Sequence, residues 1–377
     1  MREATNDLYE VRSEPEERIR LEFRAAEELE RIDDALERDI SALAVHARSL
    51  FYACDETATV ERLLWDSRRG AFGSHRSFAL GEHFDLPDGP DGEMDIEGLA
   101  IDGGYLWITG SHSYKRDDPD EGDTDLSSLD DIDVDPNRGF LGRVPLVDRG
   151  DGELEPVGRI ETLDGVERTA ACMKMRDDGR TLLRKRLSGD RLLAPFMGLP
   201  CKENGFDVEG LAASGDRLWL GLRGPVIGQR SLLVEVRTKT TKKGWLKPRR
   251  LSDGRRYRLV ALPLDGLGVR DLLIDGDRML VLAGATTDVE GPQSIYSVEL
   301  SRLDEAAVVA EADVVRILDL PVHRGCDHAE GIAFFEREGR RCLAVAYDAP
   351  ADDRIDEKDH WLELDLFDVL TRVGGSS

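Results

Sequence analysis

Long apolar runs are missing from this sequence of 377 residues. No stretch reaches the roughly eighteen consecutive apolar residues that a membrane-spanning helix requires, and the charged first residues do not resemble a secretory leader. We therefore expect a cytoplasmic protein that has no membrane partner.

Cysteine pairs at metal-binding or redox spacing are also missing. The five cysteines are widely spaced, odd in number and not arranged as CxxC: Cys54, Cys172, Cys201, Cys326 and Cys342. We identify no Cys/His cluster either, so the pattern is typical neither of a disulfide framework nor of a zinc site. We interpret the cysteines as small buried hydrophobic residues.

Basic residues are scarce relative to acidic ones. The chain has 51 Lys and Arg against 77 Asp and Glu, which gives a formal net charge of −26. A surface this acidic repels phosphate backbones, so nucleic acid is not expected as a partner.

What the sequence does contain is a repeated phrase. The clearest copies are MDIEGLAIDGGYLWITGSHS from Met94, FDVEGLAASGDRLWLGLRGP from Phe206 and HAEGIAFFEREGRRCLAVAYDAP from His328. Two weaker copies are ISALAVHARSLFYACDET from Ile40 and VRDLLIDGDRMLVLAGATT from Val269. Each copy reads as a short apolar strand, a tight turn and a second strand.

The repeat predicts an all-β fold, a β-propeller. A third and a fourth strand can be assigned after most copies, and four antiparallel strands per repeat of about 60 residues are typical of propeller blades. The last copy lacks a fourth strand, which IRLEF from Ile19 can supply by closing the ring. Five blades are favoured, and a sixth stays open within the long interval between Leu99 and Leu211. We expect residues 1–377 to form a single domain.

Three segments interrupt the repeat. Residues 114–137 are acidic and read as a loop, whereas residues 162–204 have helical spacing and predict a cap. Residues 24–38 are expected to form a helical connector. Both insertions fall on links that converge on one face of a propeller, so we expect them to cap the same axial mouth.

Aligning the copies places charged residues at equivalent positions around this mouth. Carboxylates on rigid strands suit a hard cation such as Ca²⁺, and the candidate metal ligands are Asp95, Glu97, Asp207, Glu209 and Glu330. Candidate ligand-binding residues are Asp55, Arg223, Arg270 and Asp348. His112 and His328 are candidates for proton transfer beside a bound cation, which would make the protein a metal-assisted hydrolase of esters or phosphoesters.

Two alternatives stay open. Arg270 falls between the Glu209 and Glu330 copies, so these side chains can instead form a buried ion-pair network that only stabilises the channel. The mouth can also bind a small molecule without catalysis, or the protein can be a non-enzymatic scaffold for a protein partner. The sequence does not decide whether the protein is an enzyme, and it does not predict an oligomeric state.

Several phrases together resemble one known family. LPCKENG, GFDVEGLA and GLRGPV, with the opening DISALAVHARSLFYACDET, are similar to the domain of unknown function 3616, and the resemblance extends over residues 19–370. It implies a propeller-like fold and no established activity. A more distant similarity to esterase-like phytase propellers implies metal-assisted hydrolysis, although Arg270 and Ser41 interrupt the ring of acids.

Overall fold

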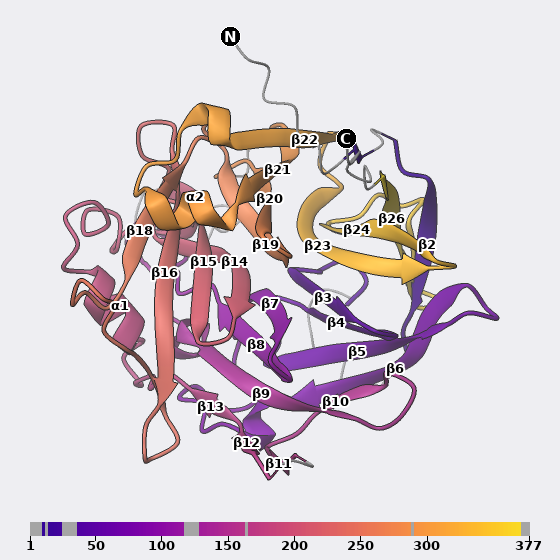
Figure 1. The fold of residues 1–377 in the computed structure, drawn as a ribbon, viewed down its shortest axis with the longest axis horizontal. Helices are drawn as coiled ribbons and strands as arrows, with labels where there is room; N and C mark the ends of the chain where they lie inside the picture. The colour runs from indigo at the N-terminus through magenta and orange to yellow at the C-terminus, as the bar shows by residue number, and fades with distance from the viewer. Residues whose placement is uncertain are drawn as a thin grey trace, which may run out of the picture.

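The computed structural model describes residues 10–11, 14–24, 36–116, 128–162, 165–287 and 290–370. The fold is all-β and propeller-like, with antiparallel strands arranged around a common centre (Figure 1). The sheet paths divide into runs of four strands. In chain order they are β3 (Ala42–His46), β4 (Ser49–Ala53), β5 (Thr59–Asp66) and β6 (Ala71–Ala79); β7 (Ile96–Asp102), β8 (Tyr105–Gly110), β9 (Leu141–Asp148) and β10 (Leu154–Pro156); β14 (Asp207–Ser214), β15 (Arg217–Gly224), β16 (Ser231–Thr240) and β18 (Arg258–Leu262); β19 (Gly268–Asp275), β20 (Arg278–Gly284), β21 (Gln293–Glu299) and β22 (Val314–Leu320); and finally β23 (His328–Arg337), β24 (Arg340–Asp348), β26 (Trp361–Leu370) and β2 (Glu17–Glu22).

The first and last runs are joined into one sheet. Strand β2 comes from the N-terminal region and pairs antiparallel with β26, where Ile19 lies opposite Leu364. Its other edge pairs in parallel with β6, where Arg20 lies opposite Ala71. The N-terminal strand therefore completes the last run, as expected, and also links it to the first run in a ten-stranded sheet.

The first strands of the five runs lie at the centre and contact one another in a cycle. Strand β3 contacts β7, β7 contacts β14, β14 contacts β19, β19 contacts β23, and β23 returns to β3. The glycine after the motif glutamate makes this approach possible. A Cβ at Gly98 would lie 2.6 Å from the Cβ of Leu211 on the next inner strand, and one at Gly331 would lie 2.8 Å from the Cβ of Leu43. The glycine after the motif glutamate is therefore required for packing between inner strands in these two copies.

Apolar clusters fill the space between neighbouring runs. Trp107 and Trp219 are fully buried in them, in agreement with a role in packing. Four cysteines are buried, whereas Cys326 is partly exposed, and none of the five forms a disulfide. No helix within the described ranges is long and apolar enough to span a membrane.

The insertions carry little regular structure. Within residues 162–204, the structure contains the short strands β12 (Glu167–Thr169) and β13 (Ala171–Cys172), α1 (Leu182–Leu187) and η5 (Cys201–Glu203). Strand β12 pairs with β11 (Arg159–Glu161) in a separate two-stranded sheet, and β13 pairs with β9. Part of this segment is therefore extended, although its helical spacing predicted a helical cap. Residues 117–127 of the acidic insertion and residues 25–35 of the expected connector lie outside the described residues.

The remaining elements decorate the edges of the runs. Listed in chain order, they are β1 (Glu10–Val11), η2 (Leu80–Glu82), η3 (Ser128–Asp130), η4 (Pro136–Gly139), β17 (Leu246–Pro248), α2 (Leu300–Glu305), η6 (Glu311–Asp313) and β25 (Ile355–Asp356). Strands β1 and β25 pair with β26, and β17 pairs with β16. They leave the centre of the molecule to the five inner strands.

Candidate functional site

A β-bulge sets the direction of the repeated charged residue. In the pairing of β7 with β8, Ile96 lies opposite Gly110 and Gly98 opposite Thr109, so Glu97 has no partner across the ladder. The same irregularity occurs in β14, β19 and β23, at Glu209, Arg270 and Glu330. An extra residue in one strand re-aims its side chain. The bulge therefore turns this position of four inner strands toward the centre.

The side chains at these positions line a cavity of about 380 Å³. Eight of the eleven predicted site residues contribute to its wall: Asp55, Glu97, Glu209, Arg223, Arg270, His328, Glu330 and Asp348. Ser41 occupies the equivalent place before β3 and lines the cavity too. Its hydroxyl is held by the backbone carbonyls of Ala53, at 3.0 Å, and Ile96, at 2.5 Å.

One side of the cavity is an ion-pair network. The Nη1 atom of Arg270 lies 2.9 Å from Oε2 of Glu209 and 2.6 Å from Oε1 of Glu330. The Nε atom of Arg223 lies 2.7 Å from Oδ2 of Asp207 and 2.8 Å from Oε1 of Glu209. Burial alone would lower the pKa of Arg223, but the charges of Asp207 and Glu209 outweigh it and raise that pKa well above its ordinary range. Both arginines are therefore charged and engaged by acids.

The other side of the cavity is acidic, and only one of its three carboxylates, that of Asp95, contacts a described basic side chain. Asp55, Asp95 and Glu97 each offer a carboxylate oxygen, and these oxygens all lie within 4.8 Å of one another. Glu97 is only 9% exposed, and no basic side chain in the described ranges forms an ion pair with it. Burial raises the pKa of Glu97 well above its ordinary value, and the charges of Asp55 and Glu209 raise it further. The pKa of Asp55 is raised for the same reasons, by burial first and then by Asp39 and Asp95.

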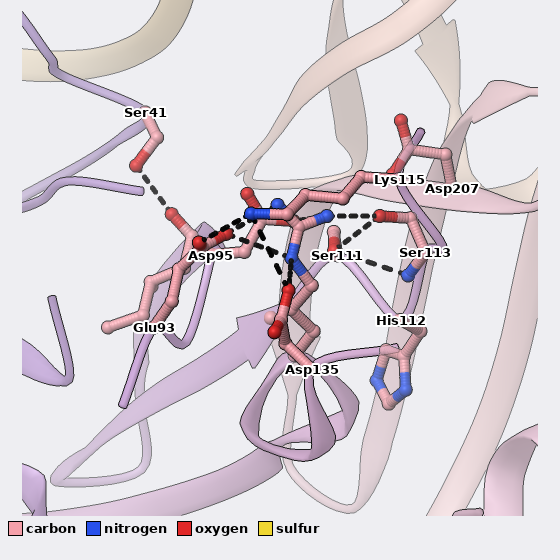
Figure 2. A network of polar contacts seen from close by, with 12 residues as sticks. Ser41, Glu93, Asp95, Ser111, His112, Ser113, Lys115, Asp135 and Asp207 are labelled. Carbon is pink, nitrogen blue, oxygen red and sulfur yellow. Dashed lines mark hydrogen bonds and ion pairs between the residues drawn. The ribbon is translucent and has the colours of Figure 1, made fainter. Parts of the chain in front are cut away.

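Asp95 connects this acidic group to a second network behind it. Its Oδ2 atom lies 3.0 Å from Nη1 of Arg138, whose guanidinium also contacts Glu93 at 2.5 Å. Figure 2 shows Glu93, Lys115 and Asp135 gathered around these contacts, with the Lys115 ammonium 3.0 Å from Glu93. Burial raises the pKa of Asp95, whereas the Arg138 charge opposes this shift. Of Asp55, Asp95 and Glu97, Asp95 is thus the only one that contacts a basic side chain among the described residues.

The two candidate histidines lie in different surroundings. His112 is 1% exposed, does not line the cavity, and neither of its ring nitrogens has a hydrogen-bond partner in the described structure. No dashed contact reaches its ring in Figure 2. Burial, followed by the charge of Arg184, lowers its pKa to about 3. The structure therefore does not bring His112 to the cavity, and its ring is neutral at neutral pH.

His328 does line the cavity. Its Nδ1 atom lies 4.0 Å from Oδ2 of Asp348, and the side chain is partly exposed. The nearby Asp348 carboxylate raises the pKa of His328 above its ordinary value, against the effect of burial. A histidine with a raised pKa beside a cavity can hold a proton near neutral pH.

Several residues that shape the site were not predicted. Arg138 and Glu93 set the charge environment of Asp95, and Glu290, Gln293 and His323 line the cavity. Glu93 directly precedes the repeated phrase and was a visible candidate. Arg138 lies at the end of the acidic insertion and has no counterpart in the other copies, so no repeat-based signal pointed to it.

The chain is similar to several solved structures at low sequence identity. A glutaminyl cyclase from Myxococcus xanthus is 12% identical with a TM-score of 0.39, over 95% of this chain and 100% of that one. Hydrazine synthase from Kuenenia stuttgartiensis is 9% identical with a TM-score of 0.33, over 84% and 57% of the two chains. The Dos1 propeller is 8% identical with a TM-score of 0.30, over 82% and 56%.

No curated protein matches the sequence. The similarity to esterase-like phytase propellers stays a prediction that these matches do not address. The sequence profile of one family, described as "Protein of unknown function (DUF3616)", matches residues 39–363. Because this match covers most of the sequence, the chain belongs to the DUF3616 family.

Proposed function

We propose that the five runs of strands are the blades of a five-bladed propeller, and that its axial cavity binds a divalent cation through Asp55, Asp95 and Glu97. The cyclic contacts among the inner strands support the blade count. The observation that carries the binding proposal is the uneven charge compensation of the cavity wall.

The two sides of the cavity differ in how their carboxylates are compensated. Arg270 and Arg223 balance Glu209, Glu330 and Asp207. Glu97 is buried and Asp55 is partly buried, and both lie beside Asp95, where ionised carboxylates repel one another and pay a desolvation cost. A cation removes both costs, whereas without one these groups must hold protons. The ion-pair network that the sequence suggested as an alternative therefore lies on one side of the cavity. The carboxylates on the other side are left for a cation.

The ligand atoms favour a hard cation. All three candidate ligands are carboxylates, and Ca²⁺ prefers six to eight oxygen ligands and tolerates irregular geometry. Three carboxylates leave positions for water or for an oxygen of a small molecule in the cavity. Asp207, Glu209 and Glu330, also expected as ligands, act in this proposal as partners of the arginines.

Metal-assisted hydrolysis is the reaction that this arrangement supports. A cation at Asp55, Asp95 and Glu97 would polarise an ester or phosphoester oxygen in the cavity. His328 lies on the cavity wall with Asp348 behind it, and it would transfer the proton. His112 has no part in this proposal because its ring does not face the cavity.

Calorimetric titration of the metal-free protein with Ca²⁺, Mg²⁺ and Mn²⁺ tests the binding proposal. We expect one equivalent of Ca²⁺ to bind to the wild type, and Glu97→Gln to weaken this binding at least tenfold. The matched control is Glu336→Gln, because Glu336 is an exposed glutamate on β23. Equal binding by the wild type and Glu97→Gln would refute the site.

Hydrolysis is tested separately with p-nitrophenyl phosphate and p-nitrophenyl acetate in the presence of the bound cation. Turnover by the wild type and its loss in His328→Ala, with activity kept in His46→Ala, would support the reaction; His46 is exposed at the end of β3. A protein that binds no cation and hydrolyses neither ester would leave small-molecule binding without catalysis and the interaction scaffold as the remaining candidate functions.

A further inference from the structure

A second group of metal-ligating side chains lies in the link between β22 and β23. His323, Cys326 and Asp327 each offer one ligand atom, and these atoms lie within 4.8 Å of one another. The sequence around them is HRGCDH from His323. We did not predict this Cys/His group from the sequence, because we looked for closely spaced cysteines and the group contains only one cysteine.

The backbone brings these side chains together. His323 and Cys326 form an antiparallel bridge across the two residues between them, and Gly325 takes the left-handed conformation that such a turn needs, with φ of +69°. Residues that flank a two-residue turn are direct cross-strand neighbours. Asp327 follows with φ of +57°, so its carboxylate turns back toward the same place.

The carboxylate of Asp327 is fixed before any metal binds. Its Oδ1 accepts a hydrogen bond from the backbone N–H of Ala351 at 2.9 Å and lies 3.0 Å from Nε of Arg354. Its Oδ2 lies 2.7 Å from Nδ1 of His323. Arg354 also contacts Asp365, at 2.6 and 2.9 Å. Its single positive charge is therefore shared between two carboxylates and does not fully neutralise that of Asp327. A metal ion would replace the proton between Asp327 and His323.

The two other side chains are accessible to ions from solvent. The His323 side chain is 49% exposed, whereas that of Asp327 is 2% exposed. Cys326 is partly exposed, unlike the four buried cysteines. A buried, oriented carboxylate with an accessible thiol and imidazole is a combination that a purely structural turn does not require.

We propose that His323, Cys326 and Asp327 bind Zn²⁺. Thiolate, imidazole and carboxylate are the three ligand types that zinc takes in proteins, and a site with three protein ligands keeps a fourth position open. His323 also lines the axial cavity, so the open position lies at its rim. The thiolate distinguishes this site from the carboxylate group at Asp55, Asp95 and Glu97, which suits a harder ion.

This site shares no residue with the cation site proposed above, so either can fail alone. Co²⁺ reports on it directly, because a cobalt–thiolate bond gives a charge-transfer absorption band in the near ultraviolet. The experiment titrates the reduced, metal-free protein with Co²⁺ in excess Ca²⁺, which occupies carboxylate sites. We expect a band that saturates at one equivalent and that Zn²⁺ abolishes by competition.

The variants are Cys326→Ser and His323→Ala, both at accessible positions where a folding defect is not expected. Cys326→Ser should abolish the band. His323→Ala removes a direct ligand and should weaken Co²⁺ binding by about 10–100-fold or more, because the loss of a residue that only hydrogen-bonds to a ligand already costs about that much. His46→Ala is the control and should bind as the wild type does. Circular dichroism checks the fold of each variant.

Two results would overturn the zinc site: no thiolate band in the wild type, or a band that Cys326→Ser retains. The cation proposal is unaffected by either result, because Ca²⁺ binding to Asp55, Asp95 and Glu97 is measured without Co²⁺. Conversely, Glu97→Gln should leave the Co²⁺ band unchanged.

Discussion

The Nη1 atom of Arg270 lies 2.9 Å from Oε2 of Glu209, on the neighbouring inner strand. Both residues occupy the bulge position of their strands, so one copy of the repeat supplies the counter-ion for another. Glu97 occupies the same position on β7 and has no such partner among the described residues. This difference separates the compensated side of the cavity from the side where we place a cation.

Removing Arg270 should destabilise the protein strongly. Arg270→Met leaves the buried Glu330 without a cation and Glu209 with Arg223 alone, and breaking a buried pair in this way costs about 3–5 kcal/mol. Urea unfolding measures the change. Adding Glu330→Gln should recover part of the loss, and Arg186→Met, at an exposed position on α1, should change stability by less than about 0.5 kcal/mol. A loss below about 1 kcal/mol, as for surface pairs, would contradict the network.

Glu97→Gln should have opposite effects with and without a bound cation. In metal-free protein it removes a buried carboxylate that lacks a partner, and we expect stability at neutral pH to rise by about 1 kcal/mol or more. In saturating Ca²⁺ it removes a ligand, so the variant should gain less stability from Ca²⁺ than the wild type does. Unfolding midpoints in chelator and in Ca²⁺ give both values. A variant less stable than the wild type in chelator would contradict our description of Glu97.

The pH dependence of metal-free protein follows from the same carboxylate. The pKa of Glu97 in the folded protein lies well above 4.5, its ordinary value, so above pH 4.5 the folded state holds a proton that the unfolded state has lost. The contribution of this group is fully present below pH 4.5 and is lost as pH rises through the folded-state pKa, at up to about 1.4 kcal/mol per pH unit. Wild-type stability should therefore fall relative to Glu97→Gln as pH rises. A difference that is constant from pH 4 to pH 8, a range chosen around these values, would contradict the raised pKa.

The glycine after the motif glutamate should resist substitution. In Gly98→Ala the new Cβ would lie 2.6 Å from the Cβ of Leu211 and 2.8 Å from Cγ2 of Thr109, and overpacking of this kind costs about 1–3 kcal/mol. Gly189→Ala is the control, since no atom lies within 4 Å of its Cβ position. Thermal unfolding of the two variants compares them. Equal midpoints would show that the inner strands do not depend on this close contact.

The sequence predicted the structural features that recur in the copies of the repeat. Glu97, Glu209 and Glu330 were identified because the three clearest copies place a glutamate before a glycine, and the structure puts all three on the cavity wall. The N-terminal strand that completes the last run was predicted because that run lacked a strand. Repetition carries this information because equivalent positions in a cyclic arrangement face the same centre.

What differs between copies could not be predicted in the same way. Asp95 and Asp207 share one motif position, yet Arg138 contacts the first and Arg223 the second. The reach of a long arginine side chain from another element decides which acid is compensated. His112 was a candidate for proton transfer at the predicted mouth, but its backbone takes a left-handed conformation, with φ of +54°, and its ring is buried outside the cavity wall.

Diffraction from crystals grown with Mn²⁺ in place of Ca²⁺ tests the central claim most directly, because anomalous scattering locates the ion. We predict one anomalous peak within coordination distance of Asp55, Asp95 and Glu97, and no such peak in Glu97→Gln crystals. An anomalous map of the wild type without a peak at these carboxylates would contradict the claim.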